Sequence, residues 1–65
     1  MQDIKIIKLP EVLEMTQLSQ ATIYRLMAQG KFPRQFKLSE RSSGWLKQEV
    51  LEYLEDRLND RHFSA

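Results

Sequence analysis

The chain has no cysteine and only two glycines, two prolines and one histidine among its 65 residues. Without cysteine, neither a disulfide framework nor a thiolate metal site can form, so a hydrophobic core must stabilise the fold alone. No apolar run exceeds three residues, whereas a membrane-spanning helix needs about 20. No apolar stretch with a small-residue cleavage site follows Met1. These absences exclude disulfide-rich secreted and membrane-spanning proteins, and we expect a cytoplasmic protein.

The length of the chain suits one small domain. The sequence shows no internal repeat, low-complexity tract or linker, so we expect residues 1–65 to form a single domain with a frayed tail over residues 60–65. The single histidine, His62, lies in that tail with no neighbouring ligand set. We therefore expect no metal, no cofactor and no enzymatic activity.

Charge is distributed unevenly, although the net charge is only +1. Residues 20–46 contain five cations and a single carboxylate, Glu40, whereas the segments before and after carry net negative charge. A basic middle between acidic ends suits a protein that turns one face toward phosphate. Chance clustering of charges on a solvated surface is the alternative interpretation.

Two short helices are predicted in the first half of the chain. The first begins at Pro10 and runs to about Met15, with proline at the first helical position and acidic Glu11 in the first turn. After a short turn, Ser19 is a suitable N-cap for a second helix that Gly30 terminates.

The second helix is predicted to be amphipathic. Ile23, Leu26 and Met27 follow the spacing i, i+3, i+4 and define its buried stripe. The residues on its other side are Ala21, Thr22, Tyr24, Arg25 and Ala28. Two short helices joined by a tight turn, the second with a small and basic outer face, are typical of a helix-turn-helix.

The pattern changes after Gly30. Phe36, Leu38 and Trp45 surround the polar stretch over residues 39–44, which predicts a β-hairpin, with Trp45 anchored in the core. From about Lys47 to Asp60 a third helix is predicted. Its inward residues are Val50, Leu51, Leu54 and Leu58, and its solvated side carries Glu49, Glu52, Glu55 and Asp56. The fold class is therefore mainly α with a small β-hairpin, a winged helix-turn-helix of three helices plus a wing.

The outer face of the second helix is the candidate surface for reading a DNA duplex. Arg25 can donate two hydrogen bonds to guanine, and Gln20 can pair with adenine. Ser19 and the free N–H groups of the first turn can hold a phosphate. The candidate DNA contacts on this helix are Ser19, Gln20, Ala21, Thr22, Tyr24 and Arg25. The alternative makes Ser19 only a cap, Tyr24 a packing residue and Arg25 a solvated charge.

The predicted hairpin supplies a second candidate surface. Lys37 and Arg41 flank its turn, and the hydroxyl groups of Ser42 and Ser43 can donate to phosphate or to minor-groove edges. In the alternative interpretation the turn is merely solvated and the serines only form it.

With these residues in place, the chain resembles the AlpA family of prophage regulatory proteins, which is similar in turn to MerR-type DNA-binding domains and phage excisionases. The matching pieces, in order, are LPEVL (9–13), LS (18–19) with TIYR (22–25), GKFP (30–33), and GWL (44–46) with EV (49–50). In two places the chain departs from the usual pattern: Gln17 stands where the family usually has glycine, and Gln20 where it usually has a cation. A positive φ at Gln17 would cost about 1 kcal/mol.

The resemblance implies a protein that binds double-stranded DNA of a prophage or genomic island at an attachment site or promoter region. It would act as an excisionase, a recombination directionality factor that biases a tyrosine-type integrase, or as a transcriptional regulator of an integrase gene. MerR-type proteins dimerise through a long added helix that this chain lacks, so we expect a monomer in solution with cooperative binding on DNA. The alternative is a protein-binding module that inhibits a partner regulator through the acidic third helix.

Overall fold

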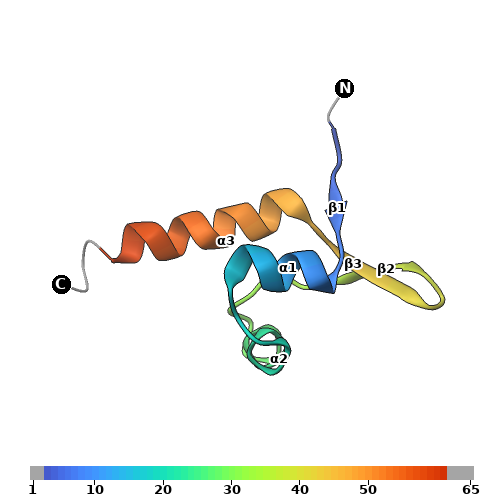
Figure 1. Ribbon diagram of the computed structural model, residues 1–65, viewed down its shortest axis with the longest axis horizontal. Helices are drawn as coiled ribbons and strands as arrows, with labels where there is room; N and C mark the ends of the chain where they lie inside the picture. The colour runs from blue at the N-terminus through green and yellow to red at the C-terminus, as the bar shows by residue number, and fades with distance from the viewer. Residues whose placement is uncertain (1–2, 62–65) are drawn as a thin grey trace.

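The computed structural model describes residues 3–61, which form three helices and a three-stranded antiparallel sheet (Figure 1). The elements are β1 (Ile6–Ile7), α1 (Leu9–Thr16), α2 (Gln20–Ala28), β2 (Phe36–Ser39), β3 (Ser42–Leu46) and α3 (Lys47–Asp60). In Figure 1, α1 lies between α2 and α3, and the β2–β3 hairpin extends away from the helices. This confirms the predicted winged helix-turn-helix. Within the described residues, no helix has the length and apolar character to cross a membrane.

Helix α1 begins one residue earlier than predicted. Leu9 is its first residue and Pro10 its second, and the Val12 N–H donates to the Lys8 carbonyl at 3.0 Å. The placement of Pro10 at the first position is therefore wrong, for a simple reason. The N–H groups of the whole first turn have no partner within the helix, so proline costs no hydrogen bond at either position.

The turn between α1 and α2 depends on a left-handed residue. Gln17 has φ 60° and ψ 24°, as its place in the family pattern suggested. Its backbone N–H donates to the Leu13 carbonyl at 2.8 Å, and its side-chain amide donates to the Glu14 carbonyl at 2.7 Å. These bonds satisfy carbonyls at the end of α1. They hold a backbone conformation that glycine adopts without steric cost.

Both ends of α2 follow the predicted capping chemistry. The Ser19 hydroxyl accepts a hydrogen bond from the Thr22 backbone N–H at 3.2 Å. At the other end Gly30 has φ 72°, and the next N–H, that of Lys31, donates to the Leu26 carbonyl at 2.8 Å. This arrangement is a Schellman motif, which explains why glycine stands at this position.

The hairpin turn is shorter than predicted. Only Glu40 and Arg41 separate the strands, and the cross-strand pairs run from Phe36↔Gly44 to Ser39↔Ser42. Assigning the whole polar stretch of residues 39–44 to the turn is therefore wrong. The stretch is polar because much of a projecting hairpin is solvated on both faces.

Gly44 serves a different purpose from turn formation. A Cβ atom there would lie 2.9 Å from Ile6 Cγ2 and 2.9 Å from the Ile7 carbonyl oxygen. Strand β1, which was not predicted from the sequence, lies beside β3 at this point. The two strands pair antiparallel through Ile6↔Leu46 and Ile7↔Trp45. Two residues are too few to show the alternation that identifies a strand.

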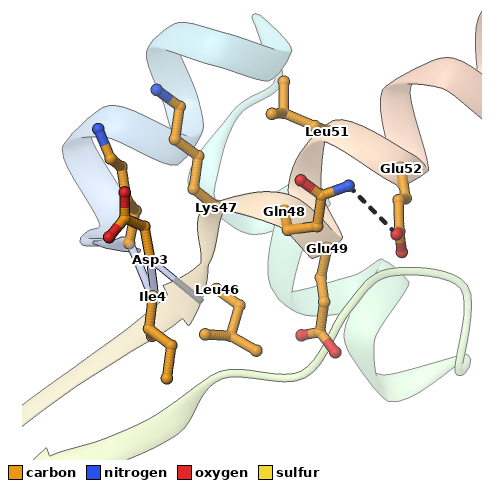
Figure 2. Close-up of a pocket in the computed structure, with 9 residues that line it drawn as sticks. Asp3, Ile4, Leu46, Lys47, Gln48, Glu49, Leu51 and Glu52 are labelled. Carbon is orange, nitrogen blue, oxygen red and sulfur yellow. Dashed lines mark hydrogen bonds between the residues drawn. The ribbon is translucent and has the colours of Figure 1, made fainter. Parts of the chain in front are cut away.

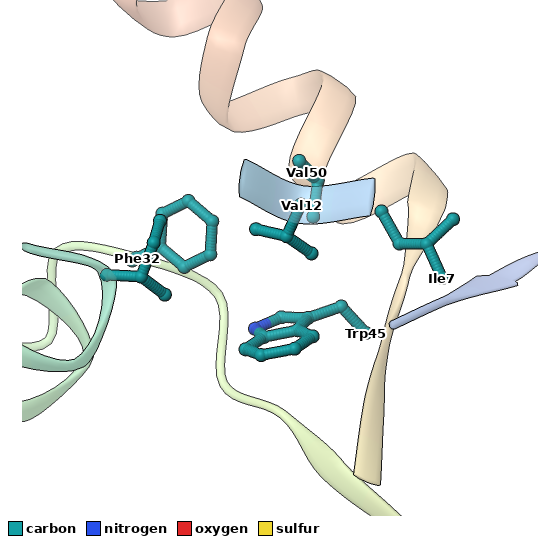
Figure 3. Close-up of a cluster of buried hydrophobic side chains, with 6 residues drawn as sticks. Ile7, Val12, Phe32, Trp45 and Val50 are labelled. Atoms are coloured by element: carbon teal, nitrogen blue, oxygen red, sulfur yellow. The ribbon is translucent and has the colours of Figure 1, made fainter. Parts of the chain in front are cut away.

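The core takes one residue from every helix, from β1 and β3, and from the connection after α2, and none from β2. Figure 3 shows Val12 and Val50 near the Trp45 indole, with Phe32 and Ile7 on either side. The six buried residues are Ile7, Val12, Ile23, Phe32, Trp45 and Val50. The Trp45 indole N–H donates to the Pro33 carbonyl at 3.0 Å, so the buried ring leaves no donor unsatisfied. The predicted anchoring role of Trp45 is confirmed.

Helix α3 has the predicted bounds but a narrower buried face. Val50 is buried, whereas Leu51 and Leu58 are exposed, so placing these two leucines in the core is wrong. Tyr53 contributes instead, packing edge to face on Phe32 with ring centroids 4.7 Å apart. Asp60 belongs to the helix rather than to the expected tail, and His62 lies outside the described residues.

The strained turn gives a stability prediction. We expect Gln17→Gly to raise the free energy of unfolding by about 0.5–1 kcal/mol, because glycine relieves the left-handed strain. The melting temperature should rise by about 4 °C in a circular-dichroism melt. Gln17→Ala is the matched control, since it removes the same side-chain hydrogen bond and keeps the strain. A Gln17→Gly protein no more stable than Gln17→Ala would contradict this explanation.

Candidate nucleic-acid interface

The N-terminus of α2 is exposed and carries no acidic residue in its first turn. Ser19 caps it, and the Ser19 and Thr22 hydroxyls lie 2.9 Å apart. Thr22 is half-buried and its hydroxyl contacts the cap, so it is less exposed than predicted. The partial positive charge of the helix end is left without a local carboxylate, which favours an anion such as a phosphate.

The outer face of α2 is small, open and cationic. Ala21, Arg25 and Ala28 lie at i, i+4 and i+7, so they share one side of the helix, and all three are exposed. Tyr24 lies beside them with 40% of its surface exposed, and Gln20 is exposed at the first turn. The expectation that Arg25 faces outward is confirmed. Small side chains on both sides of an arginine let a helix approach another surface closely.

The hairpin carries two exposed cations. Lys37 lies in β2, and its ammonium donates to the Glu40 carbonyl at 3.4 Å, which draws it toward the turn. Arg41 occupies the turn itself, where its N–H donates to the Ser39 hydroxyl at 3.4 Å. Both side chains are therefore at the projecting end of the hairpin seen in Figure 1.

The two candidate serines lie in β3 rather than in the turn. Ser43 pairs with Lys37 across the hairpin, and Ser42 accepts a hydrogen bond from the Lys8 ammonium at 3.5 Å. Both are half-buried. Their hydroxyls are less available to a ligand than turn residues would be. Lys8, however, reaches the hairpin through this contact and adds a cation there that was not predicted.

One further cation joins the helix to the hairpin. Arg34 lines a hollow of about 330 Å³ between the end of α2 and the base of the hairpin. Ala28 of α2 and Lys37 of β2 line the same hollow. Arg34 was part of the basic middle of the sequence but not a candidate contact, because periodicity cannot place a residue of an irregular connection.

Four exposed cations on α2, on the connection that follows it and on the hairpin make up what we call the basic surface. It consists of Arg25, Arg34, Lys37 and Arg41. Within residues 3–61, none of the four is engaged in an ion pair; the pair that does occur joins Arg57 to Asp60 on α3. Unpaired cations at a protein surface remain available to phosphate.

The described residues offer exposed cations rather than a cluster of metal ligands. No group of three or more His, Cys, Asp or Glu side chains within residues 3–61 is arranged to hold a metal ion. The cations of the basic surface lie on a short helix with one exposed face and on the hairpin beside it. An α-helix fits into the major groove of B-DNA. The acidic residues of α3 are exposed as well, as the alternative of a protein-binding module acting through this helix requires.

Comparison with known proteins agrees with this architecture. Residues 5–58 match the family described as prophage CP4-57 regulatory protein (AlpA). The chain is also similar to a protein of Enterobacteria phage P4, designated uncharacterized protein ORF88, with 35% identity over 57 residues. That alignment covers 88% of this chain and 65% of the phage protein, so the chain spans somewhat less than two thirds of its relative. The family match extends from β1 almost to the end of α3, and the chain belongs to the AlpA family of prophage regulatory proteins.

Proposed function

We propose that the chain binds double-stranded DNA by placing α2 in the major groove and the β2–β3 hairpin on the neighbouring backbone. The observation that carries this proposal is the outer face of α2, where Arg25 projects between two alanines and no carboxylate within residues 3–61 pairs with it. Membership of a prophage regulatory family supports it. The DNA contacts we propose are those predicted from the sequence. We add Arg34 because it lies between the end of α2 and the hairpin.

The basic surface, the N-terminus of α2 and Gln20 make different kinds of contact in this proposal. Arg25 can read guanine through a two-pronged hydrogen bond, which specifies sequence. The α2 N-terminus, Arg34, Lys37 and Arg41 contact phosphates, which set register and supply most of the affinity. Gln20 is exposed at the first turn, where its amide can pair with adenine.

The biological role we propose is prophage excision, regulation of an integrase gene, or both. An excision factor needs no catalytic group of its own, because it binds near the attachment site, bends the DNA and biases a separate tyrosine-type integrase. A regulator of the integrase promoter needs the same helix and hairpin. The two roles therefore share one interface and are distinguished by the DNA site that it occupies.

Substitution of Arg25 tests the DNA contact most directly. We expect Arg25→Ala to weaken binding to an attachment-region or promoter fragment about tenfold or more, measured by fluorescence anisotropy, because a two-pronged guanine contact is lost. Arg57→Ala is the control, since Arg57 lies on α3 in an ion pair with Asp60. If no fragment shows a salt-dependent interaction with the wild-type protein, DNA binding is wrong. If Arg25→Ala keeps full regulatory activity, the protein-binding alternative gains support.

The hairpin cations give a second prediction, based on salt dependence. Lys37→Ala and Arg41→Ala should each reduce the slope of log K against log salt by about 1 and weaken all sequences alike, since each removes one phosphate contact. Lys31→Ala is the matched control, because Lys31 lies beside the acidic residues of α3. An unchanged slope for both hairpin variants would remove the hairpin from the interface.

A reconstituted recombination reaction separates the two biological roles. With a tyrosine-type integrase encoded near the gene and the matching attachment sites, an excision factor should raise excision and lower integration several-fold. Arg25→Ala should lose this effect. A protein that leaves the direction of recombination unchanged but alters transcription from the integrase promoter is a regulator instead.

A further inference from the structure

Strand β1 forms one edge of the three-stranded sheet, and β3 separates it from β2. The strand order β1-β3-β2 gives β1 a neighbour on one side only. Residues 3–6, which lead into and begin this strand, are all exposed, with Ile4 at 72% and Ile6 at 42%. Figure 1 shows this segment extending away from the rest of the fold. An exposed strand edge with isoleucine side chains is a ready template for another strand.

The backbone of β1 is oriented to receive one. The Lys47 N–H donates to the Lys5 carbonyl at 2.9 Å, and Ile7 is paired with Trp45. In an antiparallel ladder, bonding to one neighbour alternates along the strand. The N–H and C=O groups of Ile4 and Ile6 therefore point to the open edge, where no strand within residues 3–61 pairs with them.

The side chains at this edge are sorted between two faces. Figure 2 shows Asp3 and Ile4 pointing in opposite directions, with Ile4 beside Leu46. Asp3, Ile4 and Lys5 all line a hollow of about 780 Å³ beside the start of α3. Ile6 and Leu38 both approach the position of a Gly44 side chain, on the face opposite the buried Trp45. One face of the edge is thus apolar, and the other carries Asp3 and Lys5.

We propose that residues 3–5, which lead into β1, pair antiparallel with the same segment of a second copy of this chain, with Ile4 opposite Ile4. In this register Asp3 faces Lys5 of the second copy, and the twofold symmetry forms this pair of opposite charges twice. A register centred on Asp3 or on Lys5 would instead place identical charges opposite each other. A register centred on Ile6 would place Lys5 opposite Ile7 and form no pair of opposite charges. The charges along the segment therefore favour the register centred on Ile4.

The contact joins the two sheets and brings together the exposed Ile4 side chains of both copies. It involves only a few residues of each chain, so it belongs with weak interfaces, with a dissociation constant on the order of 0.1 mM. The protein is then monomeric when dilute and associates where copies are held close together. The proposal does not depend on the DNA-binding function, because none of its residues belongs to the basic surface.

A charge exchange tests this register. By sedimentation equilibrium up to about 1 mM, about ten times the expected dissociation constant, we expect reversible dimers of the wild-type chain. Asp3→Lys alone and Lys5→Asp alone should each weaken dimerisation about tenfold, because both symmetric pairs become repulsive. The double variant, Asp3→Lys with Lys5→Asp, should have a dissociation constant within about threefold of the wild-type value. Both positions lie on the surface, so unfolding curves should be unchanged.

The absence of cysteine allows a second test that does not depend on charge. Positions 3 and 5 of opposite copies would be about 4.5 Å apart between Cα atoms, within disulfide range. A mixture of Asp3→Cys and Lys5→Cys proteins should therefore cross-link under mild oxidation at least fivefold more than either alone. Leu58→Cys, exposed on α3, is the control.

Three results would overturn the proposal. The first is a wild-type chain that stays monomeric at 1 mM, whatever other partner the edge then binds. The second is dimerisation that the single charge exchanges leave unchanged, which would place the contact elsewhere. The third is cross-linking of the mixture no greater than that of the separate variants.

Discussion

The arrangement of helix and hairpin depends on the burial of Trp45. Its ring is 1% exposed and is one of six core residues that come from β1, α1, α2, the following connection, β3 and α3. The indole N–H donates to the Pro33 carbonyl, which ties the hairpin strand to the connection that leaves α2. A buried donor without this acceptor would cost about 1–3 kcal/mol. The same bond therefore satisfies the core and fixes the hairpin beside α2.

The basic surface is what remains outside once this core is formed. Ile23 is fully buried, and the 3.6-residue period then turns Ala21, Arg25 and Ala28 toward solvent. The left-handed Gln17 sets the direction in which α2 leaves α1, at a cost in stability that the hydrogen bonds around it partly offset. The position of the cations is thus a consequence of how the core packs. Residues on the exposed side of α2 can be exchanged without a change in the core.

Sequence periodicity and capping chemistry predicted the helices well, because Ser19, Gly30 and the buried stripe of α2 act locally. Features that arise from distant contacts were missed. Strand β1 exists only because β3 lies beside it, and Gly44 is required by that crossing rather than by a turn. Arg34 reaches the basic surface through an irregular connection that has no period. Among candidate contacts, those on α2 were placed correctly on its exposed side, apart from the half-buried Thr22, whereas the two hairpin serines were displaced from turn to strand.

The central claim is that the outer face of α2 and the hairpin together receive a DNA duplex. An NMR titration of ¹⁵N-labelled protein with duplex DNA at low salt tests it most directly, since every backbone amide reports separately. The account predicts that the largest shifts occur from Ser19 to Arg25 and around Lys37 and Arg41, with the acidic face of α3 unaffected. Shifts centred on α3, or none at all, would contradict it.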